Sequence, residues 1–283
     1  PAPVWSDFRV PLLAGLPWPT RTGSSRMPTA LRLIVAAAAL LGATSIAHAD
    51  RPRPEPVLRL PAVNAVLSAD SVTPRAFLSR LAPSADPRVL QLAVAAMECA
   101  QASGVGREAQ RLAVIDYSRP SLAPRLWVFD LAAGKLLYEE VVAHGQGSGD
   151  NFATRFSNDD GSHQSSLGLF VTADTYSGRN GYSLRMKGLE PGVNDAAMSR
   201  AIVMHGAPYV DPQRGKTMGR LGRSWGCPAV RSAIAKPMID LLKGGQFLFS
   251  YYPDQAWLAR SALLKCPAAR TALHTADGRD TSG

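Results

Sequence analysis

Residues 201–231, AIVMHGAPYVDPQRGKTMGRLGRSWGCPAVR, indicate both the fold class and the chemistry of this chain. The apolar run 201–205 predicts a β-strand that ends in His205, so an imidazole is expected at the edge of a sheet. The glycine before Cys227 permits a tight turn at that residue. A cysteine with a histidine beside it in space is what acyl transfer through a thiol requires, and we expect these two side chains to meet.

The residues around Cys227 are expected to favour the thiolate over the thiol. Pro228 suits the first position of a helical turn, which would leave Cys227 near the N-cap of that turn. The positive end of the turn and the charges of Arg223 and Arg231 would then lower the pKa of the thiol. A buried structural thiol, or one half of a disulfide, is the alternative interpretation.

Patterns along the rest of the chain predict helices in front of a β-rich region. Asp86 is expected to cap the second helix, and the Gly-rich residues 145–166 predict a long loop. The expected helices cover residues 73–81, 86–102, 232–242 (interrupted at Pro237) and 254–264. The expected strands cover residues 112–117, 125–131, 135–143, 167–173, 201–205 and 246–252, with irregular chain between residues 173 and 201. These patterns indicate an α+β, β-rich fold class.

The N-terminal region has the pattern of an export signal. Residues 27–49 combine an early cation, an apolar middle and an Ala-x-Ala exit that ends at Ala49. The apolar middle is shorter than the ~20 residues of a membrane span, so no stable span is expected after cleavage; a retained anchor is the alternative. The expected organisation is an upstream or non-native segment (1–26), a signal peptide (27–49), a Pro-rich lead-in and helical segment (50–106), a catalytic domain (107–264) and a disordered tail (265–283).

The composition is that of a folded, exported protein. Apolar residues make up 46% and charged residues 19% of the 283 residues, which allows a sizeable core. Lys and Arg outnumber Asp and Glu by 31 to 22, an excess that suits work near an acidic polymer in the periplasm or elsewhere in the cell envelope. No basic run with interleaved aromatic residues occurs, so nucleic acid is not an expected partner.

The motifs around the histidine and the cysteine resemble the murein L,D-transpeptidase family, which has a YkuD-like catalytic domain. The resemblance rests on His205-Gly206, on Ser224-Trp225-Gly226-Cys227, and on the stretches FSNDDGSHQSSLGLFVT, GYSLRMKGLEPGVND and GRSWGCPAV. It covers about residues 126–253 and implies a β-sandwich catalytic domain with helices at its edges. The family's usual turn has His where this chain has Trp225, and Asn or Arg where it has Ala229.

The resemblance also implies a role for each residue of the two motifs. Cys227 is the expected nucleophile, His205 its base, and the carbonyl of Gly206 helps to orient the imidazole. The N–H groups of Gly226 and Cys227 are expected to form the oxyanion hole, and Ser224 to position the turn.

The implied reaction begins with attack of the thiolate on the third residue of a peptidoglycan stem peptide, which expels the terminal D-alanine. Transfer to an amine of a second stem makes a 3→3 cross-link through a thioester on the enzyme. Three alternatives stay open: an L,D-carboxypeptidase that uses water, an amidase that acts on murein-bound lipoprotein, and a non-catalytic wall-binding scaffold. No cofactor or metal is expected, because His144, His163 and His205 are far apart in the sequence and lack a metal-binding motif.

Residues near the two motifs are candidates for contact with the substrate. His163 could line the groove or supply the imidazole that Trp225 replaces, and arginines could bind carboxylates bidentately. The candidate substrate-binding residues are Trp225, Arg223, His163, Ser165, Ser166, Tyr182 and Arg185.

The chain has three cysteines, and in an oxidising compartment an odd number leaves one thiol free. Cys99 lies on a predicted helix and Cys266 follows the last predicted helix. These two could pair as a disulfide and leave Cys227 free, which is a hypothesis at this point.

Overall fold

The computed structural model describes residues 74–267, all within the unit Asn64–Gly283 of the chain. The predicted upstream segment, signal peptide and its exit at Ala49, most of the lead-in, and the tail after residue 267 lie outside the described residues. The helices are α1 (Pro74–Leu81), α2 (Pro87–Ala102), α3 (Pro212–Met218), α4 (Ser232–Leu242) and α5 (Gln255–Arg260), with short 3₁₀ turns η1 (Gln146–Ser148) and η2 (Asp195–Ala197). Among the described residues, no helix has the length and apolar character needed to cross a membrane.

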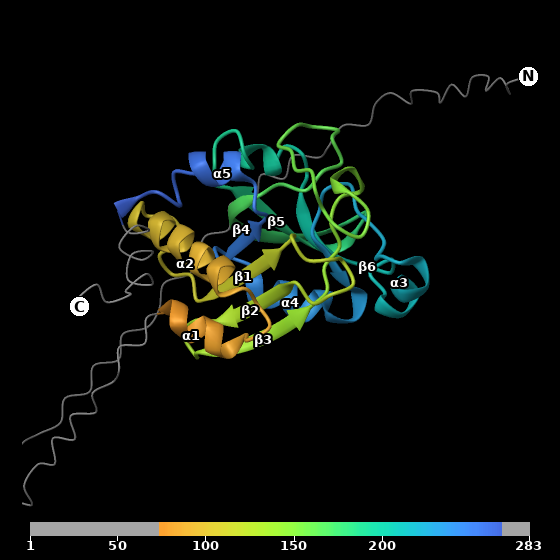
Figure 1. Cartoon of the computed structure of the whole chain (residues 1–283), viewed down its shortest axis with the longest axis horizontal. Helices are drawn as coiled ribbons and strands as arrows, with labels where there is room; N and C mark the ends of the chain where they lie inside the picture. The colour runs from red at the N-terminus through yellow and green to blue at the C-terminus, as the bar shows by residue number, and fades with distance from the viewer. Residues whose placement is uncertain (1–73, 268–283) are drawn as a thin grey trace, which may run out of the picture. The chain divides into compact units, whose positions relative to one another are not determined.

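In residues 74–267, eight strands form one hydrogen-bonded sheet in the order β3-β2-β1-β8-β4-β5-β6-β7. Figure 1 shows β3, β2 and β1 side by side at one end of this order. The strands are β1 (Arg111–Asp116), β2 (Leu126–Asp130), β3 (Lys135–Glu140), β4 (Gly168–Gly178), β5 (Gly181–Gly188), β6 (Val203–Ala207), β7 (Ala229–Arg231) and β8 (Phe247–Tyr251). Most neighbours are antiparallel, whereas β1 and β8, and β6 and β7, run parallel. The predicted α+β, β-rich class is therefore confirmed.

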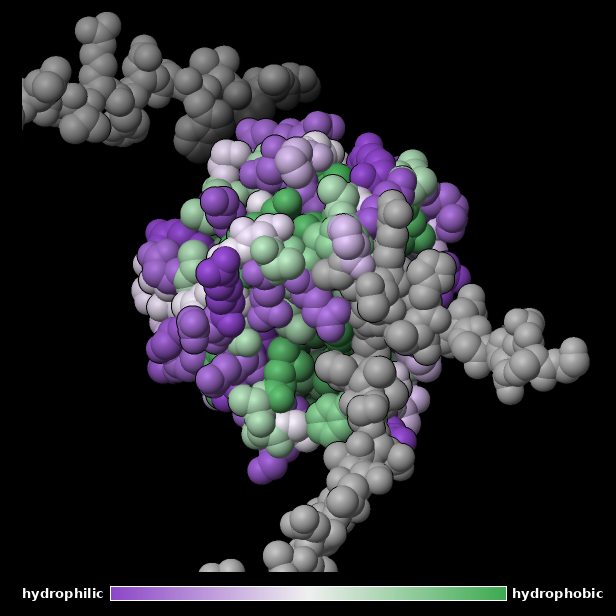
Figure 2. All heavy atoms as spheres, turned by 90° about the vertical axis from the view of Figure 1, so that its left-hand side faces the viewer, coloured by the Kyte–Doolittle hydropathy of each residue, from purple (hydrophilic) through white to green (hydrophobic). Residues whose placement is uncertain are grey.

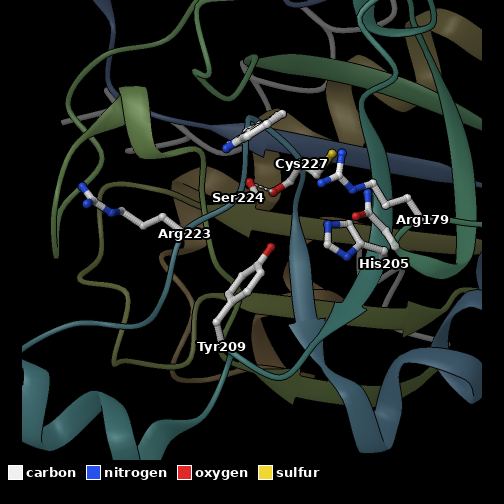
Figure 3. A pocket seen from close by; sticks show the side chains of 8 residues that line it. Arg179, His205, Tyr209, Arg223, Ser224 and Cys227 are labelled. Atoms are coloured by element: carbon white, nitrogen blue, oxygen red, sulfur yellow. Dashed lines mark hydrogen bonds between the residues drawn. The ribbon is translucent and has the colours of Figure 1, made fainter. Parts of the chain in front are cut away.

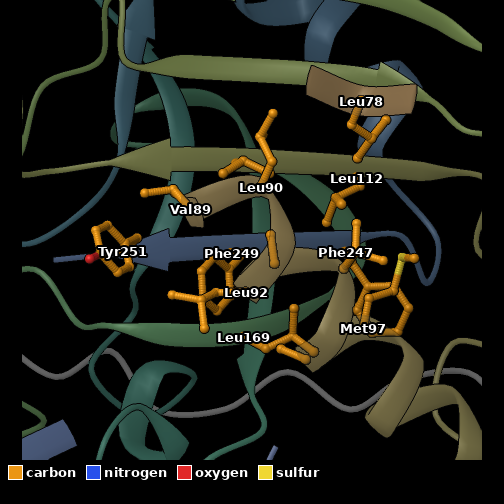
Figure 4. Close-up of a cluster of buried hydrophobic side chains, with 14 of the residues drawn as sticks. Leu78, Val89, Leu90, Leu92, Met97, Leu112, Leu169, Phe247, Phe249 and Tyr251 are labelled. Atoms are coloured by element: carbon orange, nitrogen blue, oxygen red, sulfur yellow. The ribbon is translucent and has the colours of Figure 1, made fainter. Parts of the chain in front are cut away.

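Alternating side chains of the sheet fill two separate cores. On β1, Leu112 and Val114 face one core, while Ala113 and Ile115 face the other, as the two-residue period of a strand requires. Helix α2 covers the first core and lies against β1, β4 and β8 (Figures 1 and 4). Helix α4 covers the second core and packs against β5 and β6. Both faces of the central strands are therefore buried, and the polar site lies toward the β5–β7 side of the sheet.

Helix α2 begins and is anchored as the sequence predicts. The Asp86 side chain accepts the N–H of Arg88 at 2.8 Å, and Pro87 occupies the first turn, where it has no N–H to leave unpaired. Near its other end, Cys99 forms a disulfide with Cys266, which follows α5. The proposed pairing is confirmed, and it leaves Cys227 as the free thiol.

Helices α1 and α2 also border a hollow on the outside of the first core. A hollow of about 300 Å³ is lined by Phe77, Leu78, Val94, Met97 and Leu131, together with two polar side chains. Figure 2, turned toward the side that carries these helices, shows hydrophilic side chains over most of this face with a smaller hydrophobic group among them.

The prediction of irregular chain between residues 173 and 201 is wrong. Strand β4 continues to Gly178 and pairs with β5 through a tight hairpin whose tip is Arg179-Asn180. Polar residues stand at buried as well as exposed positions of these strands, such as Thr172, Ser183 and Lys187, and they hide the apolar alternation that identifies a strand.

The helical turn expected after Pro228 does not form. Residues after it enter β7, where Ala229 pairs with His205 and with Ala143. The next helix, α4, begins only at Ser232, so Cys227 has no helix N-terminus beside it. Two further helix predictions also differ from the structure: α4 continues through Pro237, and α5 ends at Arg260.

Candidate active site

A pocket of about 280 Å³ brings together three segments that are distant in the sequence (Figure 3). The β4–β5 hairpin tip, the end of β6 with the loop after it, and the turn before β7 each contribute side chains. The lining residues are Arg179, Asn180, His205, Tyr209, Arg223, Ser224, Trp225 and Cys227. His205 and Cys227, which the sequence predicts to lie close together, both line this pocket.

His205 is held by strands on both sides and by one hydrogen bond of its ring. In the sheet it pairs with Ser183 of β5 and Ala229 of β7. Its Nδ1–H donates to the Gly206 carbonyl at 3.0 Å, because a carbonyl oxygen can only accept. Nε2 is left with its lone pair free to take a proton, and burial lowers the pKa of the ring.

Gly206 and Gly226 are required by close packing. A Cβ at Gly206 would lie 2.6 Å from Cβ of Ala235 on α4. A Cβ at Gly226 would lie 2.8 Å from the Gln164 carbonyl oxygen, and its φ of +119° is a conformation that side chains disfavour. The glycine before the cysteine therefore serves both the turn and the packing against the neighbouring loop.

Ser224 organises the turn that carries the cysteine. Its hydroxyl donates to the Cys227 carbonyl at 2.6 Å and accepts the Gly226 N–H at 3.1 Å. Its backbone N–H donates to the buried His144 carbonyl at 3.0 Å. The Gly226 N–H, which was expected to contribute to an oxyanion hole, thus donates to Ser224 in this structure.

The Cys227 sulfur is nearly buried, with the residue 7% exposed. Sγ accepts from the Val203 N–H at 3.5 Å, and the thiol donates to the Ala201 carbonyl at 3.7 Å. Burial raises the pKa of the thiol, while the Val203 N–H and the charge of Arg200 act in the opposite direction. The net direction is upward, so the prediction of a favoured thiolate is wrong.

The two arginines that were expected to favour the thiolate are paired elsewhere. Arg223 donates to the Gly149 carbonyl at 2.8 Å and forms an ion pair with Asp150 at 2.9 Å. Arg231 pairs with Glu140 on β3. The cation that acts on the sulfur is Arg200, which the sequence interpretation did not single out.

Four of the predicted substrate-binding residues bond within the protein instead. Ser165 is buried; its hydroxyl accepts the Gly145 N–H and donates to the Gly226 carbonyl, both at 3.0 Å. Ser166 is also buried, and its hydroxyl donates to the Ser157 carbonyl at 2.9 Å. These hydroxyls are not open to a ligand, because the backbone occupies them.

Tyr182 and Arg185 do not line the pocket. The Tyr182 hydroxyl donates to Asp240 on α4 at 2.7 Å, since the alternation of β5 turns this ring toward the second core. Arg185 forms an ion pair with Asp174 at 2.8 Å and lies over the ring of Tyr176.

Trp225 and His163 form a stacked pair at the rim. Their ring centroids lie 4.9 Å apart with an angle of 10° between the planes. The Gln146 side-chain amide donates to His163 Nδ1 at 3.0 Å and so fixes the ring. Trp225 is nevertheless 66% exposed, so an open aromatic face lies in the pocket that also holds Cys227.

Three lining residues were missed by the sequence interpretation. Arg179 and Asn180 occupy the tip of a hairpin that was not predicted, so nothing placed them near the site. Tyr209 follows the His205 strand, and its ring lies edge-on to the imidazole at 6.5 Å. Burial and the facing Cys227 raise the pKa of Tyr209, and its hydroxyl, which points into the pocket in Figure 3, stays protonated.

The histidines do not converge on a metal. His144 is buried, and its Nδ1 accepts from the Arg125 guanidinium at 2.8 Å. Within residues 74–267, no group of three or more His, Cys, Asp or Glu side chains is arranged to hold a metal ion.

Comparison with known proteins gives one family over most of the described residues. A family model described as an L,D-transpeptidase catalytic domain matches residues 81–251. No curated protein sequence matches.

The solved structures that match this chain have low sequence identity to it. An L,D-transpeptidase from Mycobacterium smegmatis is 14% identical, with a TM-score of 0.31, over 51% of this chain and 59% of that one. The helical cell shape determining protein Pgp2 from Campylobacter jejuni is 12% identical, with a TM-score of 0.35, over 58% and 53%. An L,D-transpeptidase (Yku) from Stackebrandtia nassauensis is 14% identical, with a TM-score of 0.29, over 63% and 75%.

Proposed function

Because the chain belongs to the family of L,D-transpeptidase catalytic domains, we propose that it is an exported cysteine acyltransferase acting on peptidoglycan stem peptides. The observation that carries the proposal is one pocket that holds a free thiol, Cys227, and an imidazole of fixed tautomer, His205. Nucleophile and base of this kind serve two-step acyl transfer without a cofactor.

In the first half-reaction, Cys227 is the nucleophile and His205 the base. Burial favours the thiol and the neutral ring, so the proton passes from Sγ to Nε2 as the sulfur attacks the carbonyl carbon of the third stem residue. A C–S bond forms, and collapse of the tetrahedral intermediate breaks the C–N bond to the terminal D-alanine. The leaving amine takes the proton from His205, and a thioester remains on Cys227.

In the second half-reaction, the side-chain amine of another stem attacks the thioester carbonyl. His205 accepts a proton from this amine and returns a proton to the sulfur as the C–S bond breaks. The product is a 3→3 cross-link. Water in place of the amine would make the enzyme an L,D-carboxypeptidase, and attack on a lipoprotein linkage would make it a murein amidase.

The lining residues supply the contacts that this scheme needs. The Cys227 N–H is the proposed donor to the oxyanion, since Ser224 occupies the N–H of Gly226. Arg179 is the proposed partner of a substrate carboxylate, since Arg223 is already paired with Asp150.

Export and the domain limits belong to the same proposal. The Cys99–Cys266 disulfide suits an oxidising compartment such as the periplasm. Residues 27–49 are the proposed signal peptide, and 107–264 the proposed catalytic domain. Mass spectrometry of the protein recovered from the periplasm tests the cleavage after Ala49.

The experiment that tests the activity is acylation by a carbapenem, followed by intact mass measurement of the full chain. We expect one adduct on the wild type and none on Cys227→Ala. The Tyr182→Phe variant is the matched control, because its hydroxyl bonds to Asp240 away from the pocket, and it should acylate like the wild type.

Product analysis then identifies the acceptor. Incubation with tetrapeptide muropeptides should give cross-linked dimers and free D-alanine, whereas tripeptides alone would indicate hydrolysis. A folded wild-type protein that takes no adduct and releases no D-alanine would support a non-catalytic wall-binding scaffold instead.

A further inference from the structure

The guanidinium of Arg200 donates hydrogen bonds to four acceptors in the loop 157–166. One terminal nitrogen donates to the Ser157 carbonyl and to the Ser166 hydroxyl, both at 2.7 Å. The other donates to the Ser162 hydroxyl at 3.1 Å and to the Gln164 carbonyl at 2.8 Å. All four acceptors belong to the same loop, so the shape of the loop depends on this one side chain.

That loop is the surface against which the nucleophile turn is packed. The Ser165 hydroxyl donates to the Gly226 carbonyl at 3.0 Å. The Gln164 carbonyl lies so close to Gly226 that a Cβ there would approach it to 2.8 Å. A displacement of the loop would therefore displace the turn that carries Cys227.

Arg200 also precedes the segment that holds the sulfur. The Ala201 carbonyl accepts the thiol proton, and the Val203 N–H donates to Sγ. Ala201 has a φ of +52°, a strained conformation that persists only where its surroundings enforce it. The four bonds of Arg200 to the loop are part of those surroundings.

The charge of Arg200 is not cancelled by a carboxylate in contact with it. In the part of the chain that the structure describes, its bonded partners are carbonyls and hydroxyls, and no salt bridge to it is found. Asp159 and Asp160 act on it only at longer range. By contrast, Arg223 is neutralised by Asp150.

We propose that Arg200 is a positioning residue for the acyl transfer: its planar fork fixes the loop against the nucleophile turn, and its charge stabilises the thiolate formed at Cys227. This inference rests on the proposed function, but its first readout is the thiol itself. A guanidinium suits the task because its N–H groups reach several acceptors at once and it stays charged.

Besides Arg200, the thiol faces other groups that titrate or carry charge, and these groups also affect its titration. The test therefore compares variants of Arg200 alone, in which all of the other groups stay the same. These groups are His205, Tyr209, Tyr117, Arg179 and Arg223.

The experiment measures the rate of iodoacetamide alkylation of Cys227 in the full chain as a function of pH. We expect Arg200→Gln to raise the midpoint of this profile by about one pH unit, as loss of a nearby opposite charge does. Arg200→Lys should leave the midpoint within about 0.3 unit, since it keeps the charge. Arg214→Gln is the matched control, because it removes an exposed arginine elsewhere and should change nothing.

The turnover rate on stem peptides distinguishes the positioning role of the Arg200 side chain from the effect of its charge. Arg200→Lys should lower kcat about tenfold or more, because an ammonium cannot reach all four acceptors. An unchanged midpoint in Arg200→Gln, or wild-type turnover in Arg200→Lys, would overturn the proposal. If Arg200→Gln does not fold, a midpoint raised by a full unit in Arg200→Lys overturns it alone.

The outcomes also distinguish this inference from the proposed function. If no variant acylates or turns over but the midpoints shift as expected, Arg200 still stabilises the thiolate and the assigned reaction is wrong. If the wild type turns over while the midpoints coincide, the reaction stands and the role of Arg200 fails.

Discussion

His205 and Cys227 are each held in the uncharged form by burial. The pKa of the imidazole is lowered and that of the thiol raised, so the resting pair is thiol and neutral ring. The sulfur bonds to the Ala201 carbonyl and the Val203 N–H. In the reaction that we propose, its proton therefore passes to His205 as the attack begins. These residues therefore support general base catalysis, in which the proton moves during the attack. They do not support a thiolate–imidazolium ion pair that exists before the attack.

We predict that His205→Ala abolishes turnover with a loss of about 10²–10⁴ in kcat/KM, because no other base replaces Nε2. The protein should keep its circular dichroism spectrum and its urea midpoint within error. Release of D-alanine from tetrapeptides is the measurement. Wild-type rates in a folded variant would remove His205 from the mechanism.

At the scale of elements, Cys227 lies at the entry to a strand and not at the start of a helix. The parallel pairing of β6 with β7 sets His205 beside Ala229, two residues after Cys227. Pro228 predicted a helical turn, but Ala229 pairs with Ala143 and His205, and the chain enters a strand instead. Local propensity was overridden because the backbone groups of residue 229 gain partners in the sheet.

The Cys99–Cys266 disulfide joins α2 to the segment after α5, and its loss should affect stability but not chemistry. We expect the double variant Cys99→Ser/Cys266→Ser to lose about 2–5 kcal/mol of unfolding free energy in urea, since the crosslink closes a long loop. Acylation by a carbapenem under native conditions should persist.

Thiol counting provides the control for this prediction. Denatured protein without reductant should take one alkyl group, on Cys227, and reduced protein should take three. Three groups without reductant would mean that the disulfide does not form in solution.

At the scale of the whole molecule, a buried cation lies behind the site. Arg125 is buried and donates to the Val142 and Arg119 carbonyls and to His144 Nδ1. His144 Nε2–H donates to the Gly149 carbonyl, and the His144 carbonyl accepts the backbone N–H of Ser224. The site is therefore supported through a histidine that must stay neutral.

The pKa of His144 is lowered to about 4, because burial and the adjacent Arg125 both oppose its protonation. In the unfolded chain the ring titrates near 6.5, so its contribution to stability is complete above that pH and is lost as the pH falls toward 4. We expect this group alone to reduce the free energy of unfolding by about 3 kcal/mol over that interval.

Urea unfolding between pH 7 and pH 4 measures this dependence. The His144→Gln variant is the comparison, because its amide can both accept from Arg125 and donate to the Gly149 carbonyl without titrating. The variant should lose less stability across the interval than the wild type. Parallel curves would contradict the assignment to His144.

Several elements of the fold, and the family, can be predicted from the sequence alone. Asp86 and Pro87 determine the start of α2, and short continuous apolar runs give β1, β2 and β8, because capping and such runs are local properties of the sequence. The motifs at His205 and Cys227 indicated the family for a similar reason: the residue types and their spacing are written in the chain.

Tertiary structure decided the rest. Which arginine acts on the sulfur, and whether Ser165 meets a ligand, depend on partners distant in the sequence: Arg200 for the sulfur, and Gly145 and Gly226 for Ser165. Whether the Gly226 N–H is free depends on Ser224, two residues away, whose hydroxyl accepts that N–H in the folded turn. The direction in which the pKa of Cys227 shifts also depends on the tertiary structure. Burial is a property of the assembled sheet and its loops, and it outweighs the Val203 N–H and the charge of Arg200, which both act to lower the pKa of the thiol.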